Sequence, residues 1–130
     1  MTARPDLVYH GTAKHYHKEQ VKTFGRYQHV PEPGLLRTDD NYRVQLANNP
    51  VTGMNFALTR SQQYWSFPIL LVVKTEIITR EARLTWEPFL SCDFLEEGWY
   101  RVFPFKLKWG KFRQETFEEL KRLEQEFLSL

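Results

Sequence analysis

The chain reads ILLVVKTEII over residues 69–78, and no other stretch of the sequence has so strong a strand pattern. Its first five residues are all apolar, and three of them are β-branched. A continuous apolar run of this kind is typical of a strand that is buried on both faces. Residues 69–78 are therefore predicted to form the central strand of a sheet.

Four shorter segments also predict strands. Residues 7–12, LVYHGT, join an apolar run to a glycine, which indicates a strand that ends in a turn. Residues 42–46 and 99–109 alternate apolar and polar side chains, and Pro104 indicates that the second of these is an edge strand or contains a bulge. Residues 55–58, NFAL, are interpreted as a further short strand.

Three segments predict helices. Residues 13–24 have a partial apolar face, and the capping box TRSQ at residues 59–62 indicates a short helix that ends before Pro68. A second capping box, TFEE at residues 116–119, indicates a C-terminal amphipathic helix over residues 113–130. Its apolar stripe consists of Phe117, Leu120, Leu123, Phe127 and Leu128.

The order of these elements predicts an α+β fold, with helices packed on a sheet in one domain over residues 1–130. A chain of 15.6 kDa buries about 68% of its extended surface on folding, which is enough to form a hydrophobic core without disulfide bonds or a bound metal. An apolar fraction of 42% and an aromatic fraction of 15% exclude a wholly disordered chain.

Charge and cysteine content narrow the class of protein. The formal net charge of +2 gives no strong case for long-range attraction to nucleic acid. The single cysteine, Cys92, excludes an intramolecular disulfide framework and fits a reducing compartment. The first ten residues lack the apolar region of a signal peptide, and the longest apolar run, residues 67–73, is too short to span a bilayer. We therefore expect a cytoplasmic protein without a membrane partner.

The segment around His10 is the strongest candidate for a binding site. His10 follows an apolar strand and precedes Gly11 and Thr12. Because glycine has no Cβ, its backbone can approach a ligand closely, and the imidazole can then hydrogen-bond a hydroxylated ligand edge. Residues 25–54, which Gly, Pro and Asn interrupt repeatedly, form a long irregular segment that is expected to be mobile.

The order of the motifs resembles the ADP-ribosyltransferase superfamily, including its poly(ADP-ribose) polymerase-like and rifampin ADP-ribosyltransferase-like branches. Those folds open with a strand ending in His-Gly-Thr or His-Gly-Ser and later place a Gly-x-x-Tyr-Phe-Ala strand, a short helix and an apolar strand. Here residues 8–12, 53–57, 62–65 and 69–76 follow that order. The resemblance implies a split antiparallel sheet with packed helices, NAD as cofactor, and a protein or nucleic-acid acceptor. It would also place part of the NAD-binding wall in residues 25–53, near His10.

The resemblance also assigns roles to the first motif. His10 would hydrogen-bond the nicotinamide-side ribose and take part in catalysis. Gly11 would contact the nicotinamide amide through its backbone, and Thr12 would support the turn.

Two further positions depart from the family pattern. The stacking tyrosine of the family aligns with Asn55, which has no aromatic face, so that Phe56 or Tyr64 would have to supply the ring over the nicotinamide. The catalytic glutamate aligns best with Glu97, which would polarise a ribose hydroxyl and stabilise an oxocarbenium-like transition state. The alternative for Glu97 is a solvated turn.

Other chemistry-bearing residues give weaker signals. His15 and His17 would share one face of a strand but not of a helix, and no carboxylate or cysteine completes a ligand set, so that no metal site is predicted. Nothing in the sequence pairs a histidine with Cys92, which favours a structural thiol over a nucleophile.

Basic and aromatic residues are interleaved in residues 14–27 and 100–113. This pattern suits single-stranded nucleic acid, and it is also typical of an amphipathic strand with a solvated lysine face. Three functions follow as alternatives. The first is an NAD-dependent ADP-ribosyltransferase-like protein, active or degenerate, and the second is a non-enzymatic nucleic-acid- or protein-binding domain on a basic and aromatic sheet surface. The third is an RNA 2′-phosphotransferase-like activity, which would need phosphate-binding arginines such as Arg26, Arg37 or Arg43.

Overall fold

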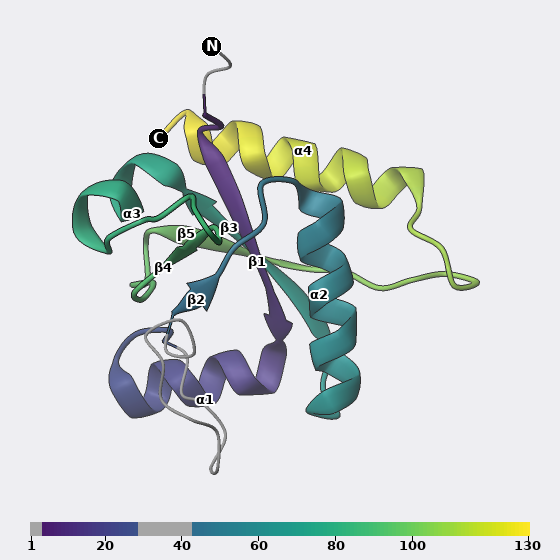
Figure 1. Cartoon of the computed structure of the whole chain (residues 1–130). Coiled ribbons are helices and arrows are strands. Elements are labelled where there is room, and N and C mark those ends of the chain that lie inside the picture. Colours follow the sequence, from purple (N-terminus) through teal and green to yellow (C-terminus); the bar gives the residue numbers. More distant parts are fainter. Residues whose placement is uncertain (1–3, 29–42) are drawn as a thin grey trace.

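The computed structural model describes residues 4–28 and 43–130 and confirms an α+β fold (Figure 1). Its main sheet has three antiparallel strands in the order β1 (Leu7–Ala13), β3 (Pro68–Lys74) and β5 (Tyr100–Pro104). The apolar residues 69–73 of the middle strand are all buried. This confirms that the apolar run forms the centre of the sheet.

A second, small antiparallel sheet pairs β2 (Val44–Gln45) with β4 (Ser91–Cys92). Ala47, just beyond β2, exchanges two main-chain hydrogen bonds with Tyr9, with N···O distances of 2.7 and 2.9 Å. The predicted strand over residues 42–46 is thus confirmed at β2, while residue 42 lies outside the described residues. The bonds between Ala47 and Tyr9 hold the end of β2 beside β1.

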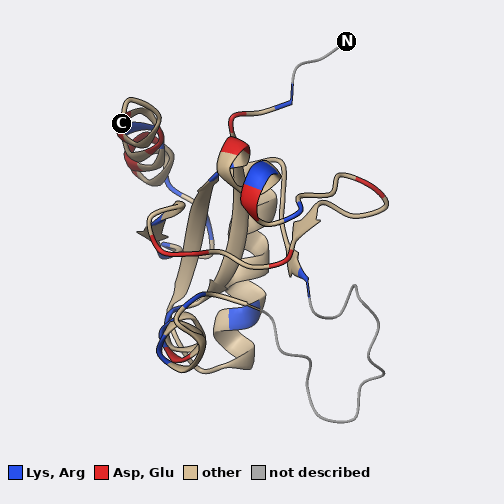
Figure 2. Ribbon diagram, turned by 90° about the vertical axis from the view of Figure 1, so that its left-hand side faces the viewer, with Lys and Arg blue, Asp and Glu red and all other residues tan. Residues whose placement is uncertain are grey.

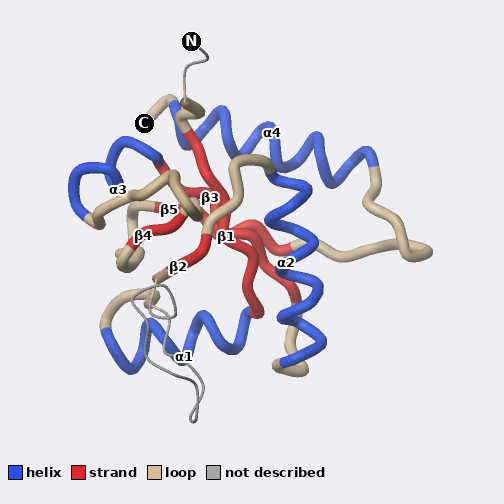
Figure 3. Tube along the Cα trace, in the orientation of Figure 1, coloured by secondary structure: helices blue, strands red, loops and turns tan. Residues whose placement is uncertain are grey.

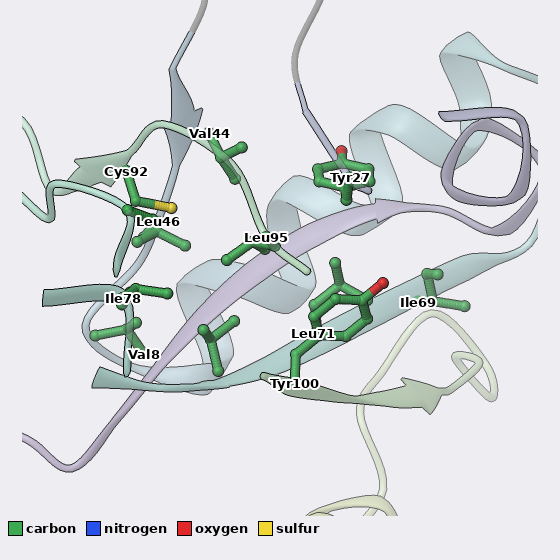
Figure 4. Close-up of a cluster of buried hydrophobic side chains, with 12 residues drawn as sticks. Val8, Tyr27, Val44, Leu46, Ile69, Leu71, Ile78, Cys92, Leu95 and Tyr100 are labelled. Atoms are coloured by element: carbon green, nitrogen blue, oxygen red, sulfur yellow. The ribbon is translucent and has the colours of Figure 1, made fainter. Parts of the chain in front are cut away.

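Different elements pack on the two faces of the main sheet. Helices α2 (Pro50–Gln63) and α4 (Gln114–Leu128) pack on one face, whereas α1 (Lys14–Phe24), α3 (Thr75–Glu81) and the small sheet lie on the other (Figure 1 and Figure 3). Because successive strand residues point to opposite faces, each face has its own core. One core joins Tyr9, Leu70, Val72 and Phe103 to Met54, Ala57, Leu120 and Phe127. Figure 4 shows the other core, which includes Val8, Leu71, Tyr27, Leu95 and Ile78.

Charged residues lie mostly on helices and loops, whereas the strands of the main sheet are almost free of them (Figure 2). Lys74 and Arg101 are the charged residues of β1, β3 and β5. The sheet is therefore an apolar support on which polar groups are held at particular places.

The interpretation of residues 55–58 as a strand is wrong, because they lie inside helix α2. The helix begins at Pro50, where the Asn49 side chain accepts a hydrogen bond of 2.9 Å from the Thr52 amide. The expected cap at Thr59 is also wrong, since its hydroxyl donates to the Asn55 carbonyl within the helix. Gly53, Met54 and Ala57 form one buried helical face, a spacing that two-residue alternation does not reveal.

Two strand ends also differ from the prediction. β1 continues through Gly11 and Thr12 to Ala13, so that no turn follows His10. β3 stops at Lys74, and residues 75–81 form α3 instead of extending the strand. The change of period explains the second difference, because Thr75 and Ile78 are buried at a helical spacing while Glu76 is exposed.

The structure of the C-terminal third agrees more closely with the prediction made from the sequence. The predicted strand over residues 99–109 is confirmed only as far as Pro104. The predicted amphipathic helix is confirmed as α4, with Leu120 and Phe127 buried and Phe117 and Leu123 packed partly against the same core. The helix begins at Gln114 rather than at the expected capping box, and no side chain caps it.

Candidate functional site

His10 lies in the middle of β1 and is only 2% exposed. Its Nδ1 is 2.5 Å from the main-chain oxygen of Gln45. A carbonyl oxygen can only accept a hydrogen bond, so Nδ1 must carry the proton. The opposite nitrogen, Nε2, lies 2.8 Å from the Tyr27 hydroxyl and 3.1 Å from Nη1 of Arg60. Because a guanidinium only donates, Nε2 is an acceptor and the ring is neutral in this arrangement.

Tyr27 supports His10 from the opposite side of the ring. The centroids of the two rings are 5.0 Å apart. The Tyr27 hydroxyl also lies 3.1 Å from Oγ1 of Thr12, which can donate to the phenol oxygen while the phenol proton points to Nε2 of His10. Burial raises the pKa of Tyr27 above its usual value, so the phenol stays neutral and keeps its proton. His10 and Thr12 point to the same face of β1 because they are two residues apart. Thr12 is therefore placed to orient Tyr27.

Arg60 reaches the same place from helix α2, in which it is the only charged residue. Besides its contact with His10, its Nη1 donates to the carbonyl of Gly11 over 3.2 Å. No motif in the sequence singled out Arg60. The signal that could have found it is its helical spacing from Phe56, four residues earlier, but this required a helix where a strand was predicted.

Gly11 allows helix α2 to cross β1 closely. A Cβ built on Gly11 would lie 1.9 Å from the carbonyl oxygen of Gly53 and 2.5 Å from the amide nitrogen of Ala57. The missing side chain of Gly11 therefore makes room for a helix backbone. This packing brings Phe56 and Arg60 to the His10 end of the crossing.

A small hollow opens where β1, β2 and α2 meet. Tyr9, His10, Gly11, Gln45, Phe56 and Arg60 line it. Its volume of about 10 Å³ is enough for about one water molecule. The hollow therefore accepts one polar group of the size of a hydroxyl, and any larger ligand must extend over the exposed residues around it, such as Gln45 and the 50%-exposed Phe56.

The other residues predicted for the site lie elsewhere in the described part of the chain. Asn55 is exposed on α2 and does not line the hollow. Tyr64 ends α2 and stacks on Tyr16, with ring centroids 4.7 Å apart. Glu97 is exposed in the turn before β5. The structure thus brings His10, Gly11 and Phe56 together and leaves Asn55, Tyr64 and Glu97 apart from them.

The charge of Glu97 affects the pKa values of two neighbouring polar side chains, His17 and Tyr100. Nε2 of His17 lies 2.8 Å from the hydroxyl of Tyr100. Burial lowers the pKa of His17, and the negative charge of Glu97 partly opposes this shift. Burial, with the same charge, raises the pKa of Tyr100 to about 12. The His17 ring also stacks on Tyr27, with a centroid separation of 5.7 Å, so this pair adjoins the His10 cluster.

The arginines named for phosphate binding have other partners or lie outside the described residues. Nη1 of Arg43 is 2.7 Å from Oδ1 of Asp93, and its Nε donates to Oγ of Ser91 over 2.8 Å, so that its guanidinium is held inside the protein. Arg26 lies over the Phe94 ring. Arg37 and residues 29–42 of the expected wall are outside the described residues.

Cys92 is fully buried, and burial raises its pKa to about 12. A thiol that is neutral and enclosed is not an activated nucleophile, so the geometry favours a structural role. Across residues 4–28 and 43–130, no three His, Cys, Asp or Glu side chains are grouped so that they could hold a metal ion. No helix in the same ranges is long and apolar enough to cross a membrane.

Comparison with known proteins found no similar protein. No family model matches the chain, and no significant match was found among curated proteins or solved structures.

Proposed function

We propose that this chain is a small NAD-binding, ADP-ribosyltransferase-like protein that holds the nicotinamide-side ribose at His10. The observation that carries this proposal is that β1, β2 and α2 bring His10, Gln45 and Arg60 to one hollow. The hollow fits one hydroxyl, which is the group that a ribose would insert. The rest of the dinucleotide would lie over the exposed Gln45 and Phe56.

Each group around the hollow has a distinct part in this binding mode. The Gln45 carbonyl fixes the His10 ring, so that Nε2 presents an acceptor to a ribose hydroxyl. Because Nε2 has one lone pair, a hydroxyl that donates to it would take the place of the Tyr27 hydroxyl, 2.8 Å away, and of Nη1 of Arg60, 3.1 Å away. The released guanidinium would then pair with a pyrophosphate oxygen, a stronger partner than a neutral ring nitrogen.

Phe56 supplies the aromatic surface that Asn55 lacks. Its ring is 50% exposed and lines the hollow, so a flat nicotinamide can stack on it without displacing core residues. The proposal therefore assigns the stacking role to Phe56 instead of Tyr64, whose ring already stacks on Tyr16. Transfer to a protein or nucleic-acid acceptor is the second part of the proposal. Glu97, the carboxylate expected to catalyse it, does not line the hollow, so the proposal assigns it no contact with the ribose.

Thermal unfolding with increasing NAD tests the binding site. A ligand that binds only the folded state stabilises it by about 2.7 kcal/mol when its concentration is 100 times Kd. We expect NAD to raise the Tm of the wild-type protein and to leave the Tm of Arg60→Gln nearly unchanged. The matched control is Arg80→Gln, on the exposed surface of α3, which should respond as the wild type does. A wild-type protein whose Tm does not change at millimolar NAD would contradict the proposal.

A further inference from the structure

A groove of about 840 Å³ lies away from the His10 hollow and shares none of its lining residues. It runs between the start of β3, the segment that follows β5 and the first turns of α4. Its volume is in the range that encloses a ligand of several rings. Two parts of the chain that are distant in sequence, Lys14 and residues 103–108, meet in it.

The groove has an excess of positive charge. Four basic residues line it, against the two carboxylates Glu115 and Glu119. Within the described ranges, none of the four basic residues takes part in an ion pair with a carboxylate. The basic residues are Lys14, Lys106, Lys108 and Arg113, and all of them are exposed. Their charges are thus available to an anionic ligand.

Aromatic rings stand exposed in and beside the groove. Phe67 lines it and is 75% exposed, while Phe103 and Phe105 are buried beneath it. Trp109 follows the lining residue Lys108 directly and is 89% exposed. Large apolar rings that face water next to unpaired cations are an unusual surface for a protein without a ligand.

The backbone conformation at Trp109 supports a role of its indole ring in binding a ligand. Its φ is 57°, in the left-handed region that few residues other than glycine adopt. Lys108 and Lys111 exchange two main-chain hydrogen bonds of 3.1 Å, which close the turn that contains Trp109. The turn therefore leaves the Trp109 side chain exposed, at a position between Lys108 and Lys111 in the sequence.

We infer that this groove binds single-stranded nucleic acid, with phosphates on the four basic residues and bases stacked on Phe67 and Trp109. Alternation of exposed rings with lysines matches the two parts of a nucleotide, since every base has a stacking face and every phosphate a negative charge. A duplex would hide its base faces and leave the rings without partners. This inference does not depend on NAD binding.

Fluorescence anisotropy with a labelled oligothymidylate and a labelled oligouridylate of about 12 nucleotides tests the inference. We expect binding at low salt that weakens as salt is added, with a slope of log K on log salt of about −2.8 for four phosphate contacts. Lys106→Gln with Lys108→Gln should reduce the slope to about −1.4. Trp109→Ala and Phe67→Ala should each weaken binding about 5-fold or more.

Two controls separate this site from general surface charge and from the NAD site. Lys121→Gln, at an exposed position of α4 outside the groove, should bind the oligonucleotides as the wild type does, and so should Arg60→Gln. The inference is overturned if neither oligonucleotide binds at low salt, or if the groove variants and Lys121→Gln have the same affinity. It is also overturned if a duplex or a polyglutamate peptide competes as well as the single strand. Circular dichroism of each variant checks that it is folded.

Discussion

A single main-chain carbonyl sets the orientation of the His10 ring. The oxygen of Gln45 fixes the proton on Nδ1, and the guanidinium of Arg60, 3.1 Å from Nε2, opposes a positive charge on the ring. The acceptor nitrogen is therefore oriented before any ligand arrives. Such pre-organisation lowers the entropy that binding must overcome.

His17 should make stability depend on pH on the acid side. Burial lowers its pKa in the folded protein, so the unfolded chain binds the proton more readily. The stabilisation is present above the ordinary pKa of 6.5 and is lost as the pH falls below it. We expect the free energy of unfolding in urea to fall between about pH 7.5 and about pH 5, and to fall less in His17→Gln.

His15→Gln is the control for this measurement, because His15 is exposed two residues before His17 on the same helix. It should lose stability with falling pH as the wild type does. Equal pH dependence of His17→Gln and the wild type would show that burial of the His17 ring does not contribute.

At the scale of elements, the crossing of α2 over β1 decides whether the hollow exists. Gly11→Ala should destabilise the protein by about 3 kcal/mol or more, because its Cβ would meet helix backbone at 1.9 Å. Gly53→Ala is the matched variant. Its nearest obstacle is the movable Cδ1 of Leu70 at 2.7 Å, and alanine favours a helix, so its loss should be only about 1 kcal/mol.

Urea unfolding of both glycine variants measures the difference. If Gly11→Ala were no less stable than Gly53→Ala, the close crossing of α2 and β1 would be wrong. NAD binding by a folded Gly11→Ala protein should also be weaker, since any movement of α2 carries Arg60 away from His10.

The elements that were predicted correctly from the sequence are those with one clear pattern of apolar residues. The stripe of α4 specifies one apolar face of a helix, and the unbroken apolar run at residues 69–73 specifies a strand buried on both faces, in each case without tertiary information. The part of helix α2 before residue 59 was missed, because Gly53 and the short apolar stretch after it resemble a strand start; the helix predicted from residue 59 is confirmed as the end of α2. The decisive signal was Asn49 with Pro50, a helix cap followed by a favoured first residue, which also reads as a turn.

At the scale of the whole molecule, the site depends on contacts between distant positions. His10 was identified from its strand and its glycine, whereas Gln45, Tyr27 and Arg60 were not. These partners are 35, 17 and 50 positions from His10, and no local pattern connects residues at such separations. Their meeting depends on the bonds between Ala47 and Tyr9 and on the α2 crossing, which only the folded chain specifies.

Proton–nitrogen correlation spectra of the histidine rings, recorded as NAD is added, observe the ribose site itself. In the free protein, His10 should have its proton on Nδ1 and an unprotonated Nε2. With NAD, the Nε2 resonance of His10 should move and saturate at the Kd obtained from thermal unfolding, while the resonances of the exposed His15 stay in place. An Nε2 resonance of His10 that does not move at saturating NAD, or that moves only together with His15, would contradict ribose binding at His10.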